Sequence, residues 1–181
     1  VMEAVEILHG EHGDSDLARE SFRLAAEMLI LGGGASTLEE AQAQVAQAVQ
    51  SGKALEAFRV WTRANGGDAA CLDDFSRLPQ AAQQVVVKAP AAGFIHGMDS
   101  RALGLLAMEL GAGRRHKDDV LDLGVGLRVH GRVGQAVEAG TPLFTVHAPA
   151  GAAVNPAPYL VAVDLRPEAA PTHPWLLETL D

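Results

Sequence analysis

The sequence predicts an α+β chain with a helical segment over residues 1–67, a connector over 68–84 and a barrel-like β domain with an inserted helix over 85–181. Three observations predict this order. Apolar residues recur at helical spacing up to an Asn-Gly-Gly turn at 65–67. Asp, Ser and Pro then become more frequent. From Val85 onward apolar residues alternate with a period of two, which is typical of strands.

The first expected helix runs through "VMEAVEIL" and ends where Gly10 and Gly13 break it. It opens in helical pattern without a cap, so we expect chain upstream of Val1, as in one piece of a longer protein. The second expected helix starts after Asp14 or Ser15. Its apolar residues form two stripes: Leu17, Ser21, Leu24, Met28 and Leu31, and Ala18, Phe22, Ala25 and Leu29. Such a wide apolar arc predicts packing on more than one side.

Two further helices are expected before residue 67. Ser36 and Thr37 start the third, and Ser36-x-x-Glu39 has the spacing of a capping box. Its expected buried side carries Leu38, Ala41, Val45 and Ala48. The fourth follows Ser-Gly-Lys at 51–53 and carries Leu55, Phe58 and Trp61.

The β domain is expected to begin with a strand, a Pro-containing turn and a short strand in "VVVKAPAAGFIHGMDS". "SRALGLLAMEL" predicts an inserted helix, and "GVGLRVHGRVGQAVEAGTPLFTVHA" returns to strand periodicity. A loop is expected over 148–158, followed by a strand in "YLVAVDL". The last residues are expected to dock through Trp175 and Leu176.

Composition excludes several classes of partner. The net charge of −9 argues against binding to a nucleic-acid backbone, which requires clustered Lys and Arg. No apolar run reaches the roughly 20 residues of a membrane span, and no signal peptide is evident. Cys71 is the single cysteine, which excludes an intrachain disulfide and fits a reducing compartment. We therefore predict a cytoplasmic protein without nucleic-acid or membrane partners.

The stretches "KAPAAGFI" and "GRVGQAVEAGTPLFTV" are typical of the two similar hairpin halves of barrel-sandwich domains that carry biotin or lipoyl on a lysine. Gly134 and Gly140 stand where such a chain turns sharply and tolerate positive φ. A carrier needs a lysine at a hairpin tip. Lys88 is the only lysine nearby and stands beside Ala-Pro in the turn, so we do not expect covalent attachment. A non-catalytic binding or carrier module is kept as the alternative function.

Two segments in combination resemble the C-terminal portion of the thymidine and pyrimidine-nucleoside phosphorylases: "KALEAFRVWTRANGGDAACLDD" and "LGAGRRHKDDVLDLGVGLRVHGRVGQAVEAGTPLFTVHA". The resemblance implies that residues 1–67 are the helical remainder of an α/β lobe and that the β domain is of the α/β-hammerhead type. It also implies a pentosyltransferase of nucleotide salvage, a cytoplasmic homodimer in its full-length form. Such an enzyme cleaves thymidine or uridine with phosphate to the free base and a (deoxy)ribose 1-phosphate.

The resemblance implies that the catalytic and substrate-binding residues lie upstream of Val1. Neither the family's Lys-His-Ser-Thr-Gly-Gly-type phosphate loop nor its base-binding Arg, Ser and Lys is found here. We therefore expect this chain alone to be an inactive scaffold that requires no cofactor. Some bacterial members hold a potassium ion with two backbone carbonyls and a Glu, and Glu3 matches that Glu. Without the upstream carbonyls we expect no ordered metal at Glu3.

Four other features were weighed as sites. His9 and His12 could suggest a metal site, but glycines break the helix that would align them. "GGGAST" before a helix could bind an anion, although a simple helix–helix turn fits better. "RRHK" is followed at once by two aspartates, which predicts an internally compensated loop. Cys71 has no His near it in sequence and predicts a semi-buried thiol without catalytic function.

Overall fold

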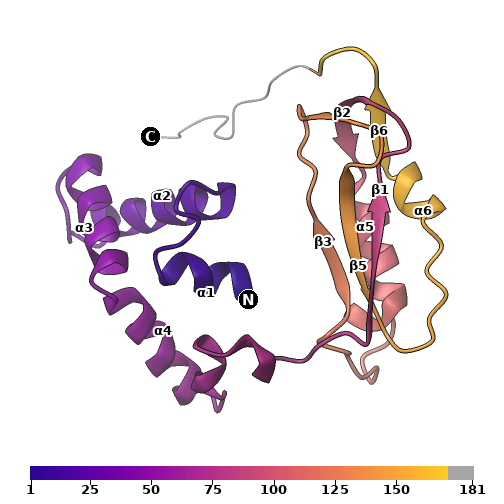
Figure 1. Ribbon diagram of the computed structural model, residues 1–181. Helices are drawn as coiled ribbons and strands as arrows, with labels where there is room; N and C mark the ends of the chain where they lie inside the picture. The colour runs from indigo at the N-terminus through magenta and orange to yellow at the C-terminus, as the bar shows by residue number, and fades with distance from the viewer. Residues whose placement is uncertain (171–181) are drawn as a thin grey trace. The chain divides into compact units, whose positions relative to one another are not determined.

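A computed structural model describes residues 1–170 and confirms a mixed α+β chain (Figure 1). The chain divides into two compact units, Val1–Leu78 and Pro79–Asp181. Within the described residues the first unit is helical and the second contains all the strands. The predicted docking of Trp175 and Leu176 lies outside the described residues. The predicted domain boundaries stay a prediction.

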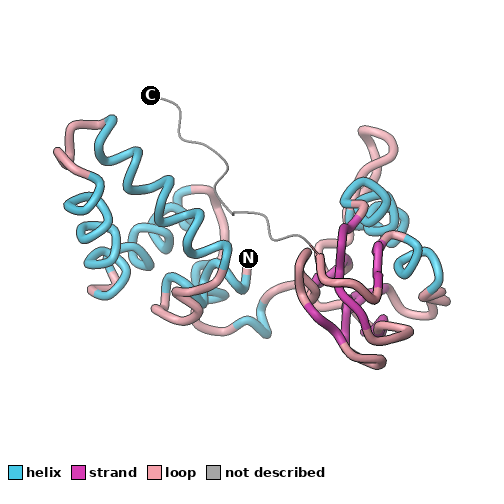
Figure 2. The backbone as a smooth tube through the Cα atoms, turned by 90° about the horizontal axis from the view of Figure 1, so that it is seen from above, coloured by secondary structure: helices cyan, strands magenta, loops and turns pink. Residues whose placement is uncertain are grey.

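The first unit contains four α-helices and two short 3-10 helices (Figure 2). They are α1 (Met2–Leu8), α2 (Asp16–Leu31), α3 (Leu38–Gln50), α4 (Lys53–Ala64), η1 (Ala69–Leu72) and η2 (Phe75–Arg77). Helix α2 packs on α3, and α4 packs on α3 and η1. The 3-10 segment is tied to α4, because Arg59 donates two hydrogen bonds to the Asp73 carboxylate at 2.7 and 2.9 Å.

Side-chain caps fix where the helices of this unit begin. Ser15 Oγ accepts a hydrogen bond from the Ala18 backbone N–H and caps α2. Helix α3 is capped by Thr37, whose hydroxyl accepts from the Glu40 N–H at 3.2 Å. The Glu40 carboxylate in turn accepts from the Ser36 N–H at 2.9 Å. The predicted pairing of Ser36 with Glu39 is therefore wrong by one residue, because Thr37 is the extended residue before the helix.

The two apolar stripes of α2 have different surroundings. Phe22, Ala25 and Leu29 pack partly buried against the small core that α2 shares with α3. In the other stripe Leu24 is 60% and Met28 is 71% exposed. Within the described residues one stripe is therefore packed and the other is largely exposed, so packing of α2 on more than one side stays a prediction.

Over residues 79–170 the second unit contains six strands and two α-helices. They are β1 (Gln83–Lys88), β2 (Gly93–Met98), α5 (Ser100–Ala107), β3 (Gly126–Val129), β4 (Ala136–Val137), β5 (Pro142–Ala148), α6 (Ala157–Val161) and β6 (Val163–Arg166). A short π-helical turn, Met108–Ala112, extends α5. The predicted inserted helix is confirmed as α5.

The strands form two antiparallel three-stranded sheets, in the orders β1-β5-β3 and β4-β2-β6. Strands β1 and β2 follow each other in the chain, yet they belong to different sheets. Strand pairing therefore does not occur within the two predicted hairpin halves. The central strand β5 aligns Val146 with Val85 of β1 on one side and Leu127 of β3 on the other.

Both sheets contribute to one hydrophobic core. Ile95 comes from β2, Val87 from β1, and Phe144 and Val146 from β5, and each is at most 1% exposed. Phe144 also packs against Tyr159 of α6, with ring centroids 6.5 Å apart. Burial of side chains this large contributes about 1.5–3 kcal/mol each, so this core is the main source of stability in the unit.

The segment "YLVAVDL", expected as one strand, divides into a helix and a strand. Residues 157–161 form α6 and only Val163–Arg166 is strand. Pro156 and Pro158 favour the first turn of a helix, where a missing N–H costs no hydrogen bond. The Asn155 side chain also accepts the Ala157 N–H at 3.0 Å. These local signals override the strand propensity of Val161.

Candidate functional site

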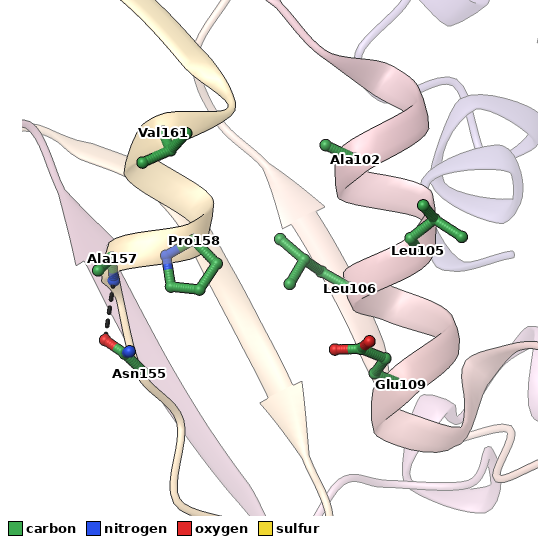
Figure 3. A pocket seen from close by; sticks show the side chains of 8 residues that line it. All are labelled: Ala102, Leu105, Leu106, Glu109, Asn155, Ala157, Pro158 and Val161. Atoms are coloured by element: carbon green, nitrogen blue, oxygen red, sulfur yellow. Dashed lines mark hydrogen bonds between the residues drawn. The ribbon is translucent and has the colours of Figure 1, made fainter.

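A groove of about 490 Å³ lies between α5 and α6 in the second unit (Figure 3). Its walls are mainly apolar, with one carboxylate and one amide among them. Its lining includes Leu105, Leu106, Glu109, Asn155, Pro158 and Val161.

The two helices that flank the groove are held by caps and by a buried ring. Asp99 caps α5 by accepting the Ala102 N–H at 2.9 Å. At the start of α6 the Asn155 side chain accepts the Ala157 N–H at 3.0 Å, and Tyr159, which is 4% exposed, anchors this helix. Burial raises the pKa of the Tyr159 hydroxyl, and the negative charge of Glu109 raises it further.

Glu109 is the one ionisable residue among those that line the groove. Its carboxylate lies 3.5 Å from the Arg115 guanidinium, and its side chain is 59% exposed. A groove with apolar walls and one exposed carboxylate suits a ligand that has an apolar body and a cationic end. It offers no paired acid and base, and none of the groove residues is a serine, cysteine or histidine nucleophile.

The loop between the π-helical turn and β3 belongs to the first part of segment 110–148, which resembles the phosphorylases. Gly111 has φ 108, and its carbonyl accepts the Asp122 N–H at 3.1 Å. Asp122 in turn accepts the Gly124 N–H at 2.9 Å. The loop is thus closed on itself by short-range hydrogen bonds and leads directly into β3.

The basic run at 114–117 is folded against its own aspartate. Asp119 Oδ2 accepts the backbone N–H groups of His116 and Arg115, at 2.9 and 2.8 Å. These two hydrogen bonds lower the pKa of Asp119. These bonds come from backbone N–H groups and not from the basic side chains, so the interpretation of an internally compensated loop stays a prediction.

The histidines considered as metal ligands do not come together. His9 hydrogen-bonds the Leu72 carbonyl at 3.0 Å, whereas His12 lies 3.9 Å from Glu6. Among residues 1–170, no group of three or more His, Cys, Asp or Glu side chains could hold a metal ion.

Glu3 lies in the first turn of α1 and is exposed. A hard cation such as potassium takes several oxygen ligands, and this carboxylate alone supplies at most two. The other two ligands implied by the resemblance are carbonyls expected upstream of Val1. The described residues therefore do not by themselves fit a potassium site, and the assignment of Glu3 stays a prediction.

The remaining candidates have structural explanations. The "GGGAST" segment joins α2 to α3, and the capping interactions of Thr37 and Glu40 occupy N–H groups there that an anion would use. Cys71 lies half-buried in η1. No helix within the described part of the chain is both long and apolar enough to cross a membrane.

Sequence reasoning missed the groove. Its polar residues, Glu109 and Asn155, are 46 positions apart, and neither belongs to a recognisable motif. The Asn-Pro start of α6 was the one local signal that could have revealed the second wall.

Comparison with known proteins identifies the second unit. Residues 94–162 match the family model described as "Pyrimidine nucleoside phosphorylase C-terminal domain". The chain is 43% identical over 148 residues, 82% of its length, to a pyrimidine-nucleoside phosphorylase of Bacillus subtilis (strain 168). It is 40% identical over 147 residues to the enzyme of the same name from Staphylococcus aureus (strain USA300), with 81% of its length covered.

The chain spans about a third of the length of these relatives, 34% of each. Both comparisons agree with the resemblance carried by residues 53–74 and 110–148. The resemblance is therefore confirmed: the chain is related to the C-terminal portion of the pyrimidine-nucleoside phosphorylases, and its residues 94–162 belong to their C-terminal domain family.

Proposed function

We propose that this chain is the C-terminal supporting part of a pyrimidine-nucleoside phosphorylase. The complete enzyme would cleave thymidine or uridine with phosphate, releasing the base and a (deoxy)ribose 1-phosphate. The observation that carries the proposal is the 43% identity over 148 residues to a phosphorylase of that name. The match covers both units rather than the β domain alone, since it spans 82% of the chain.

The described residues support a scaffold rather than a catalytic centre. Displacement at the anomeric carbon requires groups that hold phosphate and stabilise charge on the departing base. The carboxylate that lines the groove between α5 and α6 is that of Glu109 (Figure 3). The Arg115 guanidinium lies 3.5 Å from it. That chemistry does not bind phosphate, and the substrate site is proposed to lie in the part of the relatives that this chain does not match.

The β unit would brace the phosphate-binding lobe as that lobe closes on substrate. A brace must be stiff, and the shared core of the two sheets provides that stiffness, with Leu143, Phe144 and Val146 fully buried. The finer fold assignment, a barrel-sandwich of the α/β-hammerhead type, is part of this proposal. So are the cytoplasmic location and the homodimer of the full-length enzyme.

The alternative, a biotinyl or lipoyl carrier, has less support. A carrier lysine projects from a hairpin tip where a partner enzyme can reach it. Lys88 instead ends β1, aligned with Pro142 of β5 at a register irregularity. The backbone N–H of the next residue, Ala89, donates to the Thr141 carbonyl at 2.8 Å, so this turn is hydrogen-bonded to the residues that precede β5.

The test compares this chain with a chimera in which it replaces the matched segment of the Bacillus subtilis relative. Thymidine and phosphate are supplied, and thymine release is followed by absorbance. We expect phosphorolysis by the chimera and none by the isolated chain. Activity of the isolated chain would contradict the scaffold function. Inactivity of both, together with a covalent mass increase on Lys88 in cell-derived protein, would support the carrier.

A further inference from the structure

Helix α4 ends in an Asn-Gly pair, Asn65 and Gly66, and both residues are exposed. In such a pair the backbone nitrogen of the glycine can attack the side-chain amide carbon of the asparagine, because glycine has no side chain to hinder the approach. The sequence contains one other asparagine, Asn155, and the residue after it is Pro156, whose nitrogen carries no hydrogen. Asn65 is therefore the asparagine of this chain at which such a cyclisation is chemically open.

A Schellman motif closes the end of α4 and holds the Asn-Gly pair in place. Gly66, with φ 77, donates its backbone N–H to the Arg63 carbonyl at 3.0 Å. The next residue, Gly67, donates its N–H to the Thr62 carbonyl at 2.9 Å. The nitrogen that would attack Asn65 is thus engaged in one of the two hydrogen bonds that end the helix.

The backbone of Asn65 also keeps the reacting atoms apart. Ring closure requires the Gly66 nitrogen to lie on the same side of the Cα–C bond as the Asn65 side chain. With ψ 11 at Asn65, the nitrogen is turned away from that side chain. The side-chain amide itself donates from Nδ2 to the Trp61 carbonyl at 2.8 Å. Cyclisation therefore requires rotation about the Cα–C bond, which breaks the hydrogen bonds of the Schellman motif.

Fraying of the last helical turn provides that rotation. Helix ends open locally at a small fraction of the free energy of global unfolding. The surroundings of Gly66 do not oppose the motion, since a Cβ placed there would meet no atom within 4 Å. Both residues of the pair are exposed, so the opened turn is in contact with water. The reactive conformation is therefore reached without unfolding of the whole unit.

We propose that Asn65 is a site of spontaneous deamidation, and that the Schellman motif at the end of α4 sets its rate. The Gly66 nitrogen attacks Asn65 Cγ and forms a C–N bond, and the Cγ–Nδ2 bond breaks as ammonia leaves with the proton from Gly66. Water then opens the resulting succinimide at either carbonyl, which yields aspartate or isoaspartate. No oxidant or reductant takes part, and the inference is independent of the proposed function.

The product weakens the structure that slows its formation. A carboxylate at position 65 has no N–H to donate to the Trp61 carbonyl, and it places negative charge at the negative end of the helix dipole. Isoaspartate also adds a methylene group to the main chain within the motif. Helix α4 is in turn tied to η1, because Arg59 donates to the Ala69 carbonyl at 3.3 Å. Deamidation therefore loosens the junction between α4 and η1.

The test incubates the 181-residue chain under native conditions and, in parallel, unfolded in urea at the same mildly alkaline pH. Mass spectrometry follows the tryptic peptide 64–77, in which Asn65 is the sole amide side chain, for the gain of one dalton that deamidation produces. We expect this gain at least about tenfold more slowly in the native chain, because only the frayed turn reacts. Asn65→Gln is the matched control, since it keeps the amide but would need a six-membered ring. The gain should disappear in that variant.

Gly67→Ala tests the control by the Schellman motif. A Cβ at this position would lie 2.9 Å from Thr62 Cγ2 and 3.2 Å from the Thr62 carbonyl oxygen that accepts the Gly67 N–H. The variant should therefore deamidate faster than the parent when native and at the same rate when unfolded.

Each outcome decides the matter. Equal rates in the native and the urea-unfolded parent would overturn the control by the motif, as would a native rate that Gly67→Ala leaves unchanged. A native chain that gains no mass while the unfolded chain is fully converted would overturn the modification site itself. Slow conversion of the native parent and faster conversion of native Gly67→Ala, with one rate for both unfolded chains, would support the inference.

Discussion

Gly124 is a residue at which the fold leaves no room for a side chain. A Cβ at this position would lie 2.7 Å from the Gln80 carbonyl carbon and 2.9 Å from its oxygen. Both atoms belong to the backbone, so relief requires movement of the segment that enters β1. The phosphorylase-like segment thus depends on glycine here for close approach of two chain segments rather than for an unusual φ.

Gly124→Ala should destabilise the second unit by about 1–3 kcal/mol, the usual cost of inserting a methyl group into a packed site. Chemical denaturation followed by circular dichroism gives the change in the free energy of unfolding. Gly104→Ala is the control, since a Cβ there meets nothing within 4 Å in the middle of α5. That change should stabilise by up to about 1 kcal/mol through helix propensity. Equal effects of the two substitutions would contradict the steric explanation.

The pKa of Asp73 is governed mainly by its contact with Arg59. The hydrogen bonds from Arg59 lower the pKa of its carboxyl below the ordinary value of 3.8. A carboxyl whose pKa is lower in the folded than in the unfolded protein increases the free energy of unfolding at pH values above its unfolded pKa. This contribution is lost as the pH falls through its folded pKa.

Arg59→Gln should raise the Asp73 pKa toward 3.8, as measured by NMR titration of the side-chain carboxyl. The wild-type protein should be more stable than the variant at pH 6. The difference should shrink as the pH falls below 3.8, because protonated Asp73 no longer attracts the guanidinium. An Asp73 pKa that is the same in both proteins would show that the ion pair does not form in solution.

At the scale of elements, the helix starts are set by single caps. At the start of α3, Thr37 Oγ1 accepts the Glu40 N–H and the Glu40 carboxylate accepts the Ser36 N–H, one position later than the Ser36–Glu39 spacing suggests. Both spacings fit the capping-box pattern. Which of Ser36 and Thr37 caps the helix depends on which of them has an extended backbone after the Gly-rich turn, and in the structure that residue is Thr37.

Thr37→Ala should destabilise the first unit by about 1 kcal/mol, the typical cost of removing an N-cap side chain. Ser36→Ala should change the stability much less, because the bond from Ser36 to Glu40 uses its backbone N–H. Thermal unfolding monitored by circular dichroism compares the two variants. A larger loss for Ser36→Ala would restore the capping box that the sequence pattern first indicated.

At the scale of the whole molecule, the two units differ in how much they bury. The second has Ile95, Leu143, Phe144 and Val146 at 0% exposure in one core. The first has a core around α2 made of alanines and Val45, with Phe22 and Leu29 only partly buried against it and Leu24 and Met28 exposed. A unit that buries little apolar area has little to offset the loss of conformational entropy on folding.

A polypeptide of residues 79–181 should therefore fold alone and unfold cooperatively in denaturant. A polypeptide of residues 1–78 should show weak cooperativity and bind a hydrophobic dye such as ANS. Phe144→Ala should cost the second polypeptide about 3–5 kcal/mol, as for other large-to-alanine changes in a core. Cooperative unfolding of residues 1–78 without dye binding would contradict the difference in core quality.

The sequence determined the features that depend on neighbouring residues. The succession of helices, the inserted helix and the strand character from Val85 onward followed from periodicity and from Gly and Pro positions. The phosphorylase resemblance followed from residues 53–74 and 110–148. Each of these signals acts within a few residues of chain, where covalent geometry limits the backbone to few conformations.

Only the tertiary structure decided how distant segments meet. It assigned β1 and β2 to different sheets, brought Glu109 and Asn155 to one groove, and left Leu24 and Met28 exposed while alanines of the same helix are buried. Apolar spacing shows that a helix has a face to cover, but not which neighbour covers it. That choice depends on the packing of side chains far apart in the sequence, which local patterns do not encode.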